Sequence, residues 1–205
     1  MIDDSELAGV SPTDSTDDTQ ELAAPPVKKR KMNPLLEWLI VVGVAITSAL
    51  LVRAYVVQQF AVEGESMLST LQDGDRVLVN RLSYRLHDPR RGDVVVLKRF
   101  EGASEERDLI KRVIGLPGEE IEVRSCTVFI DGRQLIEPYL DAAIQKQDGC
   151  GQDQPETIVP EDTVFVLGDH RGKSSDSRAF RAVAYDMLIG RAFVIIWPMS
   201  DWAWL

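Results

Sequence analysis

The chain has 205 residues, of which 44% are hydrophobic and 27% are charged, a composition typical of a folded protein with room for one main domain. Its formal net charge of -10, from 23 basic and 33 acidic residues, excludes the class of proteins that bind nucleic acid through a basic surface. Two cysteines and two histidines are too few for a Cys/His zinc site, and we expect no metal or cofactor.

The chain begins with an acidic segment. Residues 1–27 contain seven acidic residues and no lysine or arginine, so they carry -7 of the net charge. They have no aromatic residue and many Ser, Thr and Pro residues, and such a composition cannot bury enough apolar surface to offset the entropy cost of ordering. They also lack the basic start and apolar core of a cleavable signal peptide. Residues 1–31, which include the basic cluster described next, are predicted to be a disordered cytoplasmic tail.

A basic cluster and a long apolar run follow this segment. Four basic residues at 28–31 precede an apolar run from Leu35 to Val57, in which residues 38–52 hold no charge. The run approaches the roughly 20 residues that cross a bilayer, and a basic cluster beside a span stays in the cytoplasm. Residues 32–57 are therefore predicted to be one transmembrane helix with a cytoplasmic amino terminus. The alternatives are a buried core helix with a basic cap or, for the cluster, a nuclear signal.

Residues 58–205 are predicted to form a mainly β domain outside the membrane, with little helix. Short runs rich in β-branched residues alternate there with turn residues, as strands do. The predicted strands are Arg76–Val79, Asp93–Leu97, Leu109–Ile114, Ile121–Ile130, Arg133–Ile136, Thr163–Leu167 and Arg191–Trp197. Asp131-Gly132 is typical of a hairpin turn. Helix is expected only at Ala179–Leu188 and Arg81–Leu86.

Both cysteines, Cys126 and Cys150, fall in this domain. An exported domain meets oxidising conditions, which favours a disulfide between the predicted hairpin and the polar loop Asp141–Thr157. The alternative is a pair of free thiols whose Cα atoms lie too far apart to bond.

A serine lies close to the predicted membrane surface. Val62–Leu71 places Ser66 about ten residues beyond the predicted span, two residues after Gly64. A glycine lets a ligand approach the backbone closely. Taken alone, the segment is interpreted first as a serine in a turn.

Two cations interrupt an apolar strand further along the chain. Strand alternation puts Lys111 and Arg112 on opposite faces. Burial lowers the pKa of a lysine amine, and a neutral amine can take a proton from a serine hydroxyl, whereas a guanidinium stays protonated. If either cation is a base, it is therefore Lys111. The alternative is an edge-strand lysine that extends its amine into solvent.

A third polar segment, Gly168–Arg178, follows a predicted strand and contains many charged and hydroxyl groups. Taken alone, it could be a solvated turn with an Asp176–Arg178 salt bridge. Together, in this order behind one apolar span, the three segments resemble the bacterial type I signal peptidases over residues 35–198. Ser66–Leu71 matches the family's Ser-Met-x-Pro-Thr-Leu box, Lys111–Gly118 its Lys-Arg box, and Gly168–Arg178 its Gly-Asp-Asn-Arg box.

The resemblance implies a membrane-bound serine endopeptidase that removes signal peptides from exported preproteins. Ser66 would be the nucleophile and Lys111 the general base. Ser174 would orient the lysine amine, Asp169 would support the loop, and Asp176 with Arg178 would form a structural ion pair. The backbone N–H of Ser66 would be one donor of the oxyanion hole. Some relatives supply a second donor from a hydroxyl two residues before the nucleophile; here that residue is Gly64, so a second donor must come from elsewhere.

An extended substrate is expected to add as a strand beside the nucleophile and the base. The predicted substrate-binding residues are Val62, Gly64, Glu65, Asp108, Leu109 and Ile110. The predicted location is the bacterial plasma membrane. The predicted partners are signal peptides and the lipid bilayer, and the protein is predicted to be a monomer. The tryptophan-rich carboxyl end, Trp197–Leu205, is expected either to enter the outer leaflet or to pack on the domain.

Departures from the family boxes keep other functions open. Ser69 replaces the box proline and adds a rival hydroxyl, His170 replaces an asparagine, and Gly172 and Lys173 stand where acidic or amide residues are usual. We interpret His170 as a loop substitution and not as a base. One alternative is a catalytically impaired membrane-anchored β scaffold. Another, a self-cleaving Ser/Lys repressor, is disfavoured by the apolar span.

Overall fold

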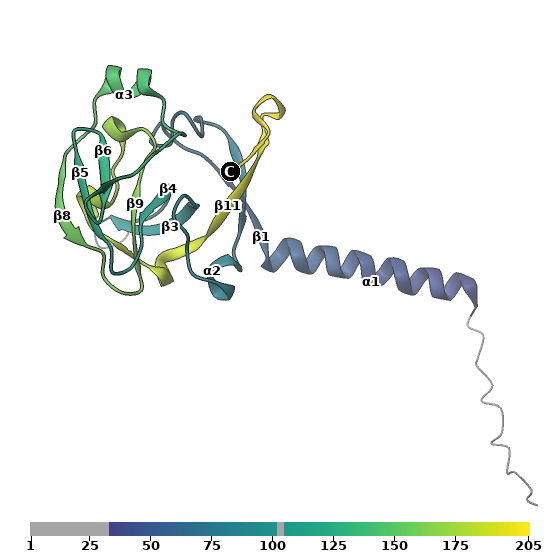
Figure 1. Ribbon diagram of the computed structural model, residues 1–205. Coiled ribbons are helices and arrows are strands. Elements are labelled where there is room, and N and C mark those ends of the chain that lie inside the picture. The colour runs from purple at the N-terminus through teal and green to yellow at the C-terminus, as the bar shows by residue number, and fades with distance from the viewer. Residues whose placement is uncertain (1–32, 102–104) are drawn as a thin grey trace, which may run out of the picture. The chain divides into compact units, whose positions relative to one another are not determined.

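The computed structural model describes residues 33–101 and 105–205 (Figure 1), and the predicted tail at 1–31 lies outside them. Helix α1, Pro34–Tyr55, begins where Asn33 accepts a hydrogen bond from the Leu35 N–H. Its segment Pro34–Arg53 is long and apolar enough to cross a membrane. The chain divides within α1 into two units, residues 1–41 and 42–205, and both sheets belong to the second. The boundary at 57/58 between span and catalytic domain stays a prediction.

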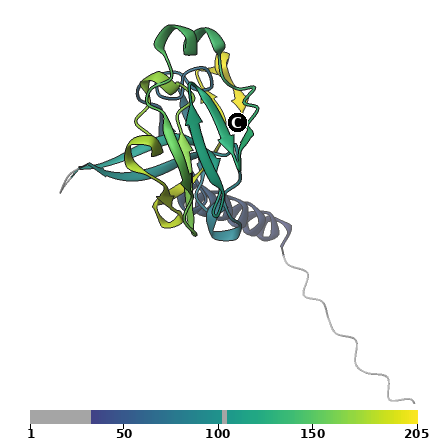
Figure 2. The same ribbon diagram turned by 60° about the vertical axis from the view of Figure 1, so that its left-hand side comes forward.

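The larger sheet has eight antiparallel strands within the described residues. Along it lie β1 (Val57–Ala61), β2 (Arg76–Asn80), β11 (Leu188–Trp197), β3 (Val94–Glu101), β4 (Glu105–Gly115), β9 (Thr163–Leu167) and β10 (Val183–Ala184), while β12 (Ala203–Trp204) pairs with β11. Strands β3 and β4 run on beyond their neighbours as a two-stranded ribbon (Figure 2). Because β9 pairs with β4 only from Arg112 to Gly115, residues 108–110 keep an edge that no described strand covers.

The smaller sheet has the order β7 (Arg133–Gln134), β6 (Thr127–Ile130), β5 (Glu120–Arg124) and β8 (Gln154–Ile158). The prediction of one strand over residues 121–130 is wrong, because the chain reverses at Ser125-Cys126, where both φ angles are positive. The predicted Asp131-Gly132 turn is confirmed. Its φ angles of 49° and 71° have the sign that a type I′ hairpin requires.

Helices are short after α1. They are α2 (Ser83–Leu86), α3 (Ala142–Asp148) and α4 (Ser177–Phe180), with 3₁₀ turns η1 (Arg171–Lys173), η2 (Tyr185–Met187) and η3 (Met199–Asp201). The helix predicted at 179–188 is wrong, since Val183 is buried on edge strand β10 and β11 already begins at Leu188. Helix α3 was not predicted because none of its residues is buried, so it has no apolar stripe; Asp141 caps it by accepting from the Ala143 N–H.

The core fixes the turn that carries the predicted nucleophile. Met67 and Leu71 are fully buried together with Val77, Val79 and Ala192 from neighbouring strands. Burial of such side chains contributes about 1.5–3 kcal/mol each. The residue directly after Ser66 is therefore anchored in the core, while Ser66 itself stays half-buried.

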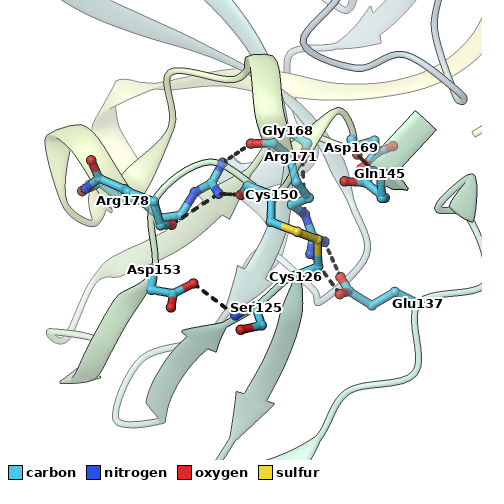
Figure 3. Close-up of a disulfide and its surroundings, with 11 residues drawn as sticks. Ser125, Cys126, Glu137, Gln145, Cys150, Asp153, Gly168, Asp169, Arg171 and Arg178 are labelled. Carbon is cyan, nitrogen blue, oxygen red and sulfur yellow. Dashed lines mark hydrogen bonds and ion pairs between the residues drawn. A yellow bond between two sulfur atoms is a disulfide. The ribbon is translucent and has the colours of Figure 1, made fainter. Parts of the chain in front are cut away.

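A disulfide joins Cys126, in the β5–β6 turn, to Cys150, which follows α3 (Figure 3). Their Cα atoms lie 4.9 Å apart, and the bond closes a loop across a sequence separation of 24 residues. Replacing both cysteines by serine frees this loop in the unfolded chain, and we expect the free energy of unfolding to fall by about 3 kcal/mol. Urea denaturation in detergent, for the variant and the oxidised protein, measures this. Equal midpoints and slopes would contradict the prediction.

Candidate active site

Ser66 and Lys111 meet in space although 45 residues separate them in the sequence. Ser66 lies in the turn after β1, and Lys111 lies on β4. The Lys111 Nζ is 2.7 Å from the Ser66 Oγ and also donates to the Ile110 carbonyl at 2.9 Å. Only 2% of Lys111 is exposed. The amine is therefore withdrawn from solvent and within hydrogen-bond distance of a serine hydroxyl.

The missing side chain of Gly168 leaves room beside it for the Ser66 carbonyl and the Ser174 side chain. A Cβ atom at this position would lie 2.5 Å from the Ser66 carbonyl oxygen and within van der Waals overlap of the Ser174 Oγ. The Ser174 hydroxyl is buried and has no hydrogen-bond partner among the described residues. Ser174 thus lies beside the turn that holds Ser66, but no direct bond joins it to the Lys111 amine.

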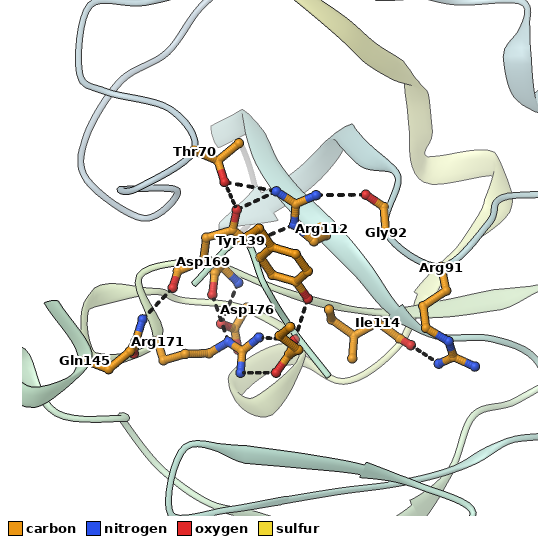
Figure 4. A network of polar contacts seen from close by, with 12 residues as sticks. Thr70, Arg91, Gly92, Arg112, Ile114, Tyr139, Gln145, Asp169, Arg171 and Asp176 are labelled. Carbon is orange, nitrogen blue, oxygen red and sulfur yellow. Dashed lines mark hydrogen bonds and ion pairs between the residues drawn. The ribbon is translucent and has the colours of Figure 1, made fainter. Parts of the chain in front are cut away.

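Asp169 links the third sequence box to the other two. Its carboxylate accepts from the Arg112 Nε at 2.9 Å and Nη2 at 2.7 Å, and from the Thr70 hydroxyl at 2.5 Å (Figure 4). Burial lowers the pKa of Arg112, but the hydrogen bond and charge of Asp169 outweigh this and raise it. Because Arg112 directly follows Lys111, this pair fixes the strand that carries the amine.

The network continues through residues that the sequence did not identify. The Arg112 guanidinium stacks over the Tyr139 ring at 4.0 Å, and the Tyr139 hydroxyl donates to Glu137. Burial, and then the Glu137 charge, raises the pKa of Tyr139. Glu137 also pairs with the fully buried Arg171, whose Nε donates to the Gly168 carbonyl. In this network each buried charged side chain therefore has a partner of opposite charge, as a stable interior requires.

Asp176 and Arg178 form the predicted ion pair, with Nη2 and Oδ2 2.8 Å apart. Asp176 also accepts from the Gly168 N–H at 3.1 Å, and Arg178 donates to the Cys150 and Arg171 carbonyls (Figure 3). The pair is buried, so the interpretation of a solvated surface salt bridge is wrong. It holds the loop that returns from β9 against the disulfide-bonded segment.

The residues that depart from the family boxes have specific places. Ser69 has a φ of 87°, which no proline can adopt, and its hydroxyl donates to the Tyr139 carbonyl at 3.0 Å. Lys173 is exposed and lies 3.2 Å from Glu65 and 3.5 Å from Asp148; its hydrogen bond to Glu65, above all, raises its pKa. A Cβ atom at Gly172 would overlap the Asp148 and Gly149 carbonyl oxygens, so the position needs glycine. His170 is completely buried.

A cleft of about 650 Å³ opens beside Ser66 and Lys111. Four of the predicted substrate-binding residues line it: Val62, Asp108, Leu109 and Ile110. Gly64 and Glu65 do not, since both lie in the exposed turn, where the Gly64 N–H donates to Asp73. The cleft therefore connects the uncovered edge of β4 with the serine and the lysine.

Residues 35–197 match the family described as signal peptidase, peptidase S26. The chain belongs to the signal peptidase S26 family. It is 37% identical to a signal peptidase I of Leptolyngbya laminosa over 195 residues, covering 93% of this chain and 92% of the relative. It is 34% identical to a signal peptidase IB of Staphylococcus aureus over 179 residues, covering 82% and 92%.

A crystal structure of a signal peptidase I from Enterococcus faecalis V583 is 34% identical, covers 51% of this chain and 97% of that chain, and has a TM-score of 0.43. Membership of the S26 family makes the chain a peptidase, and thus a hydrolase. Over the residues that the structure describes, its fold is mainly β with one long apolar helix, as the sequence predicted.

Proposed function

We propose that this chain is a membrane-anchored signal peptidase in which Ser66 is the nucleophile and Lys111 the general base. The observation that carries the proposal is the 2.7 Å approach of the buried Lys111 Nζ to the Ser66 Oγ. The relatives at 34–37% identity are named signal peptidases, which supports signal peptides of exported preproteins as substrates.

The reaction follows from the state of the amine. Desolvation disfavours the charged form of a buried lysine, so Lys111 can accept the Ser66 proton while Oγ attacks the scissile carbonyl. Lys111 then donates that proton to the leaving amine, and the acyl group remains as an ester on Ser66. A water molecule, deprotonated by the same amine, hydrolyses the ester and restores the hydroxyl. The Ser66 N–H would stabilise the oxyanion.

The surrounding residues act by holding these two groups in place. Asp169, through Arg112, would fix the strand of Lys111, and Asp176 with Arg178 would fix the loop that covers it. Ser174 would orient the lysine amine once a substrate closes the site, because its buried hydroxyl has no other partner among the described residues. None of these side chains needs to contact the substrate.

The substrate would bind as an extended strand. The edge of β4 at residues 108–110 lies in the cleft beside Ser66, so a peptide could complete its backbone hydrogen bonds there and on the facing segment after β1. Gly64 and Glu65 would contribute through backbone groups. We expect cleavage after small residues, as the family resemblance implies.

The lipid bilayer is the second proposed partner. Residues 32–57 would span it with the amino terminus in the cytoplasm. Trp197, Trp202 and Trp204 remain more than half exposed, although Trp204 stacks on Phe193 and meets Trp202 edge to face. Tryptophan favours the membrane interface, so the carboxyl end would rest in the outer leaflet.

This placement predicts contact between these tryptophans and lipid. In proteoliposomes of the Trp38→Phe variant, which removes the tryptophan of the span, we expect brominated lipids to quench at least about half of the remaining emission, because the indoles would lie in the interface. Emission equal in brominated and unbrominated lipid would show that the carboxyl end does not enter the membrane.

Cleavage of a preprotein tests the proposed function. The full-length chain in proteoliposomes should release a mature product from a preprotein with a small residue before the scissile bond, and Ser66→Ala should not. Absence of cleavage by the unaltered chain would favour the impaired scaffold.

A further inference from the structure

His170 holds the backbone on both sides of the nucleophile. Its Nδ1 lies 3.1 Å from the Glu65 carbonyl oxygen, and its backbone N–H donates to the Ser66 carbonyl at 3.1 Å. These two carbonyls belong to the peptide units that flank the Ser66 Cα. One residue of the third sequence box therefore contacts both peptide planes at the serine, and the Glu65 carbonyl also accepts from the Leu68 N–H at 3.0 Å.

The orientation of the first of these planes matters for the reaction. In a planar trans peptide the C=O and N–H point in opposite directions. The carbonyl of Glu65 and the N–H of Ser66 belong to the same peptide unit, so a hydrogen bond that fixes the carbonyl also fixes the N–H. That N–H is the proposed oxyanion donor, and a hydrogen bond to the carbonyl also polarises it.

The far side of the imidazole is anchored as well. The His170 Nε2 lies 3.0 Å from the Asp148 carboxylate, at the end of α3, and the exposed Lys173 amine lies 3.5 Å from the same carboxylate. Both ring nitrogens thus face an oxygen, the Glu65 carbonyl on one side and the Asp148 carboxylate on the other. Asp148 is two residues from the disulfide-bonded Cys150, so the anchor itself is held by the fold.

We propose that His170 is a positioning residue that aims the Ser66 N–H at the oxyanion, with Asp148 as its anchor. The inference rests on the proposed function, because it needs Ser66 as the nucleophile. His170 takes the place of a box asparagine, and an asparagine amide could also donate to the Glu65 carbonyl. Histidine at position 170 thus keeps a contact with the Glu65 carbonyl and adds a second contact, with the Asp148 carboxylate.

The test compares kcat and KM of full-length variants on a signal-peptide substrate. We expect His170→Ala to lower kcat by about 10- to 100-fold with KM changed less than about threefold, since loss of one oxyanion donor costs about 10²–10³ in kcat. His170→Asn should recover most of kcat, and Asp148→Asn should lie between. The exposed His87→Ala is the matched control and should equal the unaltered protein.

A peptide aldehyde, whose adduct with a serine carries an oxyanion, gives the deciding measurement. Its inhibition constant should rise for His170→Ala by the same factor as kcat/KM falls, as for a transition-state analogue. A kcat equal to that of the unaltered protein, or a loss explained by a lower melting temperature with unchanged aldehyde affinity, would overturn the proposal. Activity that survives Ser66→Ala would instead refute the proposed function, so the two failures are distinguishable.

Discussion

Replacing Ser66 by alanine or Lys111 by methionine is expected to lower kcat/KM for preprotein cleavage by at least about 10³-fold, because removal of one member of a nucleophile–base pair disables the whole unit. Ser66→Ala removes the oxygen that attacks. Lys111→Met keeps the length and apolar body of the side chain but removes the amine that lies 2.7 Å from that oxygen. The double variant should be no worse than either single one.

Two controls make this result specific. Ser69→Ala removes the rival hydroxyl, which already donates to the Tyr139 carbonyl, and should keep activity within a few-fold. Lys146→Ala removes an exposed lysine on α3 and should have no effect. Cleavage that survives both Ser66→Ala and Lys111→Met would contradict the mechanism. Loss of activity in Ser69→Ala alone would identify Ser69, and not Ser66, as the nucleophile.

Gly168→Ala is expected to have the second largest effect. The added Cβ would lie 2.5 Å from the Ser66 carbonyl oxygen and would overlap the Ser174 hydroxyl, so the turn that carries Ser66 must shift. Because displacement of a reacting group by about 1 Å can cost about 10²-fold in rate, we expect kcat to fall by about that factor. Steady-state kinetics and the melting temperature of the same preparation measure the two effects separately.

Gly115→Ala is the matched control for this glycine. Its Cβ would approach the Val159 and Phe165 side chains at 2.9 and 3.0 Å, in the apolar cluster that β4 and β9 share with the smaller sheet and not at the serine. We expect it to lower stability by about 1–3 kcal/mol, the usual cost of overpacking, with kcat unchanged. Similar losses of kcat in both variants would show that Gly168 acts only through stability.

The sequence predicted the features that depend on local pattern. A lysine in the middle of an apolar strand is conspicuous because burial of a charge is costly, and it indicated Lys111 before any geometry was known. The apolar run predicted α1, and β-branched runs predicted most strands of the larger sheet. The reversal at Ser125-Cys126 was missed because no Gly, Pro, Asn or Asp marks it, although the buried apolar positions change there from 121 and 123 to 128 and 130.

The buried network of hydrogen bonds and ion pairs around Asp169 could not be predicted from local sequence pattern. Arg112 and Asp169 are 57 residues apart, and Glu137 and Tyr139 lie in a loop without regular structure. Only the fold brings such groups together, and although Arg112 stands out in its apolar strand, nothing in its sequence neighbourhood identifies its partners. The burial of His170 was missed for the same reason, since its partners Glu65 and Asp148 come from distant segments.

The dependence of kcat/KM on pH tests the central claim most directly, because it reports the ionisation of the essential base in the free enzyme. A lysine buried to 2% exposure should titrate well below the value of about 10.4 for a free lysine. We therefore predict that kcat/KM rises with pH and reaches its plateau below about pH 9, with Ser69→Ala giving the same profile. A rate that still rises in proportion to hydroxide above about pH 10 would contradict a desolvated lysine as the general base.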